Sequence, residues 1–159
     1  FAQIGLVTLA FQCTASLLQP LVGYLADIKP MPYSLAVGMV ATLLGLLVLA
    51  VAPNYPVLLV SAMMVGLGSA VFHPEASRVA RMASGGRYGL AQSVFQVGGN
   101  TGQAISPLTA AALVATYGQR SIVWYAGLAL LGIVVLFQIG TWYKDHGLAR
   151  IRHARAHAA

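Results

Sequence analysis

The sequence contains very little charge. Nine basic and three acidic residues occur among 159, which is 8% of the chain, whereas an ordinary soluble domain has about 25%. This scarcity excludes a soluble domain, because most residues of a small domain must face water. The single cysteine, Cys13, excludes a disulfide-stabilised scaffold. The motifs of metalloproteases, serine hydrolases and nucleotide-binding loops are missing as well, so we expect no enzyme, no cofactor and no metal site.

Long apolar stretches fill the space between the few charges, and hydrophobic residues make up 58% of the chain. A bilayer-spanning helix needs about 20 mostly apolar residues, and the turn signal Pro53-Asn54-Tyr55-Pro56 divides the longest stretch in two. Phe1 lies within an apolar run, so we expect at least one helix before it. The sequence predicts an all-α integral membrane bundle of five transmembrane helices, at 3–26, 33–52, 57–82, 90–116 and 121–143. A basic cytoplasmic tail is predicted at 144–159.

The basic residues are distributed unequally between the two membrane faces. In this topology Arg120 lies at one face, and all the others lie at the opposite face: Lys29, Arg78, Arg81, Arg87, Lys144, Arg150, Arg152 and Arg155. Loops rich in Lys and Arg stay in the cytoplasm, so this face is predicted to be cytoplasmic. The rule explains the net charge of +6, and no nucleic-acid partner is needed beside the lipid bilayer.

Two of the predicted helices carry polar stripes with the same spacing of four, four and three residues. One stripe continues from Thr8 through Gln12, Ser16 and Gln19, and the other comprises Gln92, Gln96, Asn100 and Gln103. Each set lies on one helical face, which we interpret either as the wall of a substrate cavity or as hydrogen-bonded contact between helices. Segments 33–52 and 121–143 are almost wholly apolar and are predicted to face lipid. The order of striped, apolar and small-residue helices indicates a three-helix repeat, which is typical of transporters.

Two further sets of residues have predicted roles at helix ends and contacts. A cytoplasmic gate or charge network is expected from Asp27, His73, Glu75, Arg78, Arg81 and Arg87, for which an interfacial anchor is the alternative. Close helix packing or kinking is expected at Gly23, Gly66, Gly98, Gly99, Gly102 and Pro107.

Three stretches carry a resemblance to a known family. Gly23-Tyr24-Leu25-Ala26-Asp27 resembles a loop motif of the major facilitator superfamily, and Gly102 with Pro107 resembles its antiporter motif. The run 72–87, continued through 89–100, is similar to the fosmidomycin-resistance group of efflux transporters within that family. The arginine of the family's fourth-helix motif is absent, since Ala62 takes its position.

This resemblance implies a bacterial inner-membrane exporter of twelve helices, of which the chain would supply helices two to six. It implies a small-molecule substrate, the proton as coupling ion and alternating access, with the remainder of the transporter as partner. Three alternatives stay open: a transporter of another small molecule, a structural or channel protein, and an intramembrane enzyme using His73.

Overall fold

The computed structural model describes residues 2–147, and most of the predicted tail, from residue 148 on, lies outside them. Within that range the chain is helical and contains no strand, so the all-α prediction is confirmed. Five long helices coincide with the five predicted segments to within two residues: α1 Ala2–Ile28, α2 Ser34–Val51, α3 Tyr55–Ala83, α4 Tyr88–Tyr117 and α5 Val123–Trp142. A 3₁₀ turn, η1 (Gln119–Ile122), precedes α5, and a π-helical turn, η2 (Tyr143–Gly147), follows it.

Among residues 2–147, four segments are long and apolar enough to cross a membrane: α1, α2, α3 and Gln119–His146, which contains α5. Helix α4 is as long as α3 but carries amides, hydroxyls and glycines throughout its length. The membrane span predicted for α4 therefore stays a prediction.

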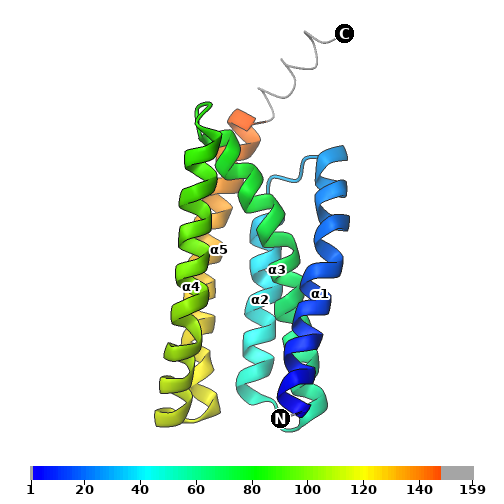
Figure 1. The fold of residues 1–159 in the computed structure, drawn as a ribbon, viewed down its shortest axis with the longest axis vertical. Coiled ribbons are helices and arrows are strands. Elements are labelled where there is room, and N and C mark those ends of the chain that lie inside the picture. The colour runs from blue at the N-terminus through cyan, green and yellow to red at the C-terminus, as the bar shows by residue number, and fades with distance from the viewer. Residues whose placement is uncertain (1, 148–159) are drawn as a thin grey trace.

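The turns between helices follow local chemistry. Asn54 caps α3, because its Oδ1 accepts a hydrogen bond of 3.1 Å from the Val57 amide. Gly118 ends α4 with φ of 75°, a left-handed conformation that suits glycine. Successive long helices consequently run antiparallel, and the ends near residues 28, 84 and 143 lie at the same end of the bundle (Figure 1). Within residues 2–147, the charged residues expected on the cytoplasmic face lie at that end of the bundle.

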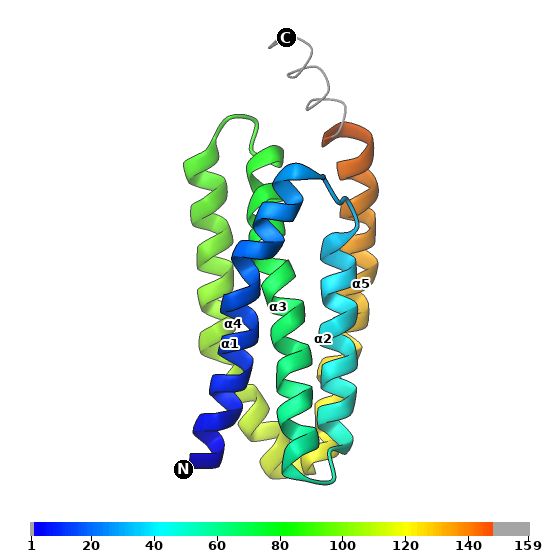
Figure 2. The same ribbon diagram turned by 90° about the vertical axis from the view of Figure 1, so that its right-hand side faces the viewer.

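The bundle is built around α3 and α2. Helix α3 packs against both α1 and α2, and α2 also packs against α5, whereas α4 meets α3 and η1 only near its ends (Figures 1 and 2). A small apolar core of Leu35, Ala36 and Leu136 joins α2 to α5, and Phe72 of α3 packs against it. The outer faces of α2 and α5 are exposed, as expected for helices that face lipid.

Glycines allow the central helices to approach closely. A Cβ at Gly66 would lie 2.8 Å from the Phe11 carbonyl oxygen of α1, and a Cβ at Gly45 would lie 2.7 Å from Val65 Cγ2. The packing role predicted for Gly66 thus matches the structure. The sequence did not indicate Gly38 or Gly45, which also lie at tight contacts between α2 and α3.

Four other glycines differ from the packing prediction. A Cβ would meet no described atom within 4 Å at Gly23, Gly98, Gly99 or Gly102. The reason for three of them is that their face of α4 borders a cavity instead of a neighbouring helix. Pro107 lies on the same cavity wall.

Candidate functional site

A cavity of about 810 Å³ opens between α3 and α4. Its lining comprises Phe72, His73, Phe95, Gln96, Gly98, Gly99, Asn100, Gly102, Gln103, Ser106 and Pro107. The two helices leave the turn at residues 84–87 side by side and diverge along the bundle (Figure 1). The cavity occupies the space that this divergence leaves, and glycines keep the α4 wall free of bulky side chains.

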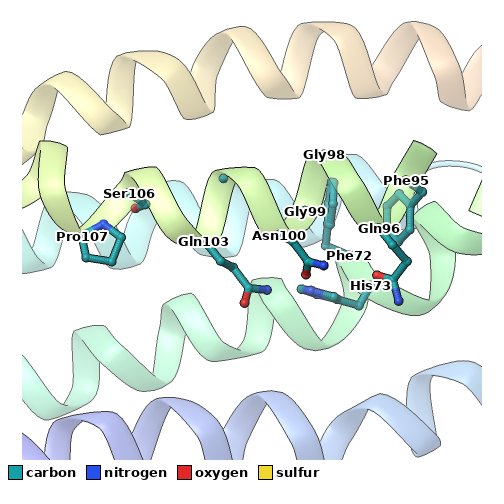
Figure 3. A pocket seen from close by; sticks show the side chains of 11 residues that line it. Phe72, His73, Phe95, Gln96, Gly98, Gly99, Asn100, Gln103, Ser106 and Pro107 are labelled. Carbon is teal, nitrogen blue, oxygen red and sulfur yellow. The ribbon is translucent and has the colours of Figure 1, made fainter. Parts of the chain in front are cut away.

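Three amides of α4 define the polar side of the cavity. Gln96, Asn100 and Gln103 follow one another at intervals of four and three residues, so they share one helical face. Figure 3 shows their amide groups in a row, directed toward α3. An amide both donates and accepts hydrogen bonds, so this row can bind oxygen-rich groups without a fixed charge.

His73 of α3 faces this row across the cavity, and Figure 3 shows its ring beside the Asn100 amide. Its Nδ1 lies 3.1 Å from the Ser69 carbonyl oxygen and 3.3 Å from the Ser69 hydroxyl. A carbonyl oxygen only accepts hydrogen bonds, and a hydroxyl oxygen can accept as well. Both contacts are satisfied when Nδ1 carries the hydrogen, whereas the other tautomer would set two lone pairs against each other. This placement separates His73 from the charge network in which the sequence had placed it.

The fourth amide of the α4 stripe has a different role. Gln92 Oε1 accepts a hydrogen bond of 2.9 Å from the Ser77 hydroxyl of α3, and Gln92 is not among the residues that line the cavity. It lies next to the turn at 84–87, where the two helices are still close. Of the two interpretations of the stripe, hydrogen-bonded helix contact fits Gln92 and a cavity wall fits the other three.

The α1 stripe does not reach this cavity. Gln12 and Ser16 are exposed, Gln19 is half-buried, and none of the three lines the space between α3 and α4. Helix α1 lies on the far side of α3 from α4 (Figure 1). The two stripes therefore do not form opposite walls of one cavity within the described residues.

A charge network joins α1, α2 and α3 at the end that carries the basic residues. Arg78 forms an ion pair with Asp27 and donates a hydrogen bond to the Ala26 carbonyl oxygen. It also lies 3.8 Å from Glu75 Oε1. Glu75 is 1% exposed, and its Oε2 accepts a hydrogen bond of 3.0 Å from the Ser34 hydroxyl.

The two remaining arginines of the predicted network differ in their positions. Arg81 lines a smaller pocket of about 290 Å³ together with Asp27, Glu75 and Arg78. Arg87 is exposed at the start of α4. Sequence reasoning missed Ser34, although a serine in the first turn of an otherwise apolar helix was a usable signal.

Comparison with known proteins identifies the family. Residues 1–157 match the sequence profile described as Major Facilitator Superfamily. The chain belongs to this superfamily. Members of the major facilitator superfamily are multi-pass membrane transporters and are not enzymes, so the prediction of a transporter fold is confirmed.

Two curated members of the superfamily are similar to most of the chain. The fosmidomycin resistance protein of Escherichia coli (strain K12) is 59% identical over 144 residues, which cover 91% of this chain and 36% of that protein. An uncharacterized MFS-type transporter, YfnC of Bacillus subtilis (strain 168), is 46% identical over 145 residues, with the same coverage of 91% and 36%. The chain thus spans about a third of the length of these relatives. No solved structure matches it significantly.

Proposed function

We propose that the chain forms part of a proton-coupled exporter of small polar antibiotics resembling fosmidomycin, working by alternating access. The observation that carries the proposal is the row of Gln96, Asn100 and Gln103 facing His73 across an open cavity. The identity of 59% to a fosmidomycin resistance protein supports the substrate class. A transporter of another small polar molecule is the alternative, since the amide row alone does not select one compound.

The energetic argument concerns the environment of this helical face. An amide that faces hydrocarbon loses its hydrogen bonds, which costs several kcal/mol. The three amides on one face of α4 would make contact between that face and lipid unfavourable. The face is stable against water or a polar substrate, and transporters bind substrates near the bilayer midplane between packed helices.

The charge network is suited to a gate that opens and closes. Asp27 is largely exposed, with 77% of its side chain accessible, and an exposed ion pair contributes only about 0–1 kcal/mol. Such a pair can break during each transport cycle at little cost. We place this end of the bundle in the cytoplasm and the protein in the bacterial inner membrane, because the described basic residues other than Arg120 lie there.

Reconstitution tests the proposal. The protein is expressed from its complete reading frame and inserted into liposomes, and an imposed pH gradient should then drive accumulation of fosmidomycin. A protonophore should abolish this accumulation. If proteoliposomes with and without the protein accumulate equal amounts under the gradient, the proposed function is wrong.

A further inference from the structure

We propose that the surface around Arg120, at the turn between α4 and α5, binds the phosphate headgroup of an anionic phospholipid, whose acyl chain lies along the outer face of α5. This site lies at the opposite end of the bundle from the charge network (Figure 1). It concerns the membrane around the protein, so it does not depend on which molecule is transported.

Arg120 is a cation without a counter-ion in the chain. The three acidic residues, Asp27, Glu75 and Asp145, lie toward the opposite end of the bundle. Within residues 2–147, the Arg120 side chain forms no ion pair and no hydrogen bond, and the residue is exposed. A guanidinium group has five N–H donors in an arrangement that binds phosphate oxygens in pairs. The partner that suits Arg120 is therefore an anion from outside these residues.

Arg120 borders two hollows in the surface. The first, of about 550 Å³, has Leu113 and Tyr117 of α4 on one side and Trp124 of α5 on the other. The second, of about 410 Å³, lies between Arg120 and the carboxyl end of α2. Tyr117 and Trp124 are each 73% exposed, and such rings prefer the boundary between lipid headgroups and acyl chains. The guanidinium group thus lies at the depth at which lipid phosphates are found.

The turn that carries Arg120 is fixed to a neighbouring helix. Gln119 Nε2 donates a hydrogen bond of 2.7 Å to the Leu49 carbonyl oxygen and another of 3.2 Å to the Ala52 carbonyl oxygen. Both acceptors belong to the carboxyl end of α2. Because the preceding residue is held in this way, the backbone of Arg120 is in place before a ligand arrives.

An apolar stripe continues from Arg120 along the outer face of α5. Trp124, Leu128 and Leu131 follow at intervals of four, four and three residues, which places them on one helical face, and all three are exposed. At a rise of about 1.5 Å per residue, Arg120 and Leu131 are about 16 Å apart along the helix axis. This is about half of a hydrocarbon core of about 30 Å, so one acyl chain can cover the stripe while its phosphate contacts Arg120.

The charge and the stripe together select a lipid with net negative charge. A soluble anion would contact Arg120 but would leave the stripe uncovered. Phosphatidylcholine would cover the stripe, but its choline cation weakens the attraction between its phosphate and a guanidinium group. An anionic phospholipid satisfies both parts of the site, and basic pockets between transmembrane helices are known to bind such headgroups.

Quenching of Trp124 fluorescence by brominated lipids tests this site. The full-length protein is inserted into phosphatidylcholine vesicles, in which an increasing fraction of the lipid is replaced by phosphatidylglycerol with brominated acyl chains, or by brominated phosphatidylcholine for comparison. The part of the quenching that disappears in Trp124→Phe reports the lipid at this site. The wild type should bind phosphatidylglycerol about tenfold more tightly than phosphatidylcholine there, as expected for one charge-assisted contact.

Variants of the arginine separate a lipid site from a general preference of the protein. Arg120→Gln should lower the ratio of the two lipid affinities to about one, whereas Arg120→Lys keeps the charge and should retain part of the preference. Arg87→Gln is the matched control, because Arg87 is an exposed arginine at the start of α4, at the opposite end of the bundle, and it should match the wild type. Equal affinities of the two lipids in the wild type, or an unchanged ratio in Arg120→Gln, would overturn the proposal.

Other occupants of this surface would give different results. If neither brominated lipid quenches Trp124, another part of the full-length transporter covers this face, and the proposal is wrong. If millimolar inorganic phosphate relieves the quenching by phosphatidylglycerol, and chloride at the same ionic strength does not, the site binds soluble anions and the assignment to lipid is wrong. None of these results requires that the protein export fosmidomycin, so a failure here is distinguishable from a failure of the proposed function.

Discussion

At the scale of single residues, burial decides which members of the charge network stabilise the protein. Glu75 is buried, one of its oxygens is hydrogen-bonded to Ser34, and Oε1 has no hydrogen-bond partner. Asp27 forms its ion pair with Arg78 at the surface. A buried polar group that loses its partner costs more than an exposed ion pair contributes.

This difference in burial predicts that two substitutions in the network have different effects, one on stability and the other on transport. Ser34→Ala should lower the stability of the purified protein by about 1–3 kcal/mol, because the buried carboxylate loses its hydrogen bond. Asp27→Asn should change stability by no more than about 1 kcal/mol but should alter the transport rate if the pair acts as a gate. Thermal unfolding and flux measurements check both, with Ser93→Ala as control, since Ser93 is exposed and its hydroxyl donates to the Gly89 carbonyl oxygen of its own helix. An equal loss of stability in Asp27→Asn and Ser34→Ala would contradict this account.

The histidine shows the limit of residue-level prediction from sequence. Its spacing from Glu75 and Arg78 suggested a common network, but two residues along a helix correspond to about 200° of rotation. His73 therefore faces α4, whereas Glu75 faces Ser34 of α2. Helical spacing alone separates the two residues, and the arrangement of the neighbouring helices shows which helix each of them faces.

At the scale of helices, the sequence predicted the elements well and their contacts less well. Long apolar runs and the Pro53–Pro56 turn located all five helices, because the bilayer fixes their length. The stripe of four amides on α4 did not show where α3 approaches. Gln92 meets Ser77 because it lies near the connecting turn, and the later amides face the cavity because the helices have diverged by then.

The contact between α1 and α3 gives a prediction at this scale. Gly66→Ala places a Cβ 2.8 Å from the Phe11 carbonyl oxygen, so the two helices must separate, and the yield of folded protein should fall. Gly127→Ala on α5 is the matched control, because its Cβ meets nothing within 4 Å and alanine favours a helix by about 1 kcal/mol over glycine. Fluorescence-detected size-exclusion chromatography measures both yields, and equal yields would show that this contact does not limit folding.

At the scale of the whole molecule, the distribution of charge predicts an orientation in the membrane. Lys29, Arg78, Arg81, Arg87 and Lys144 lie at or near the helix ends that meet at one end of the bundle, and Arg120 lies in η1 at the other. By the positive-inside rule, we expect the first end to lie in the cytoplasm.

Cysteine labelling checks this orientation in a Cys13→Ala background. His146→Cys should react with a membrane-impermeant thiol reagent only from the cytoplasmic side, and Tyr117→Cys only from outside. Tyr117 is used because Gly118, with φ of 75°, would be strained by a side chain. Labelling of residue 117 from the cytoplasmic side alone would reverse the proposed topology.

The central claim is that the amide face of α4 lies in the substrate path. The most direct test is drug efflux, normalised to the amount of protein in the membrane, for Gln96→Ala and Asn100→Ala expressed from the complete reading frame. Leu47→Ala is the control, because Leu47 is an exposed apolar residue of α2, outside the cavity. The account predicts normal protein levels in all three variants, with fosmidomycin efflux reduced several-fold in the two amide variants only. Equal efflux in all three would contradict it.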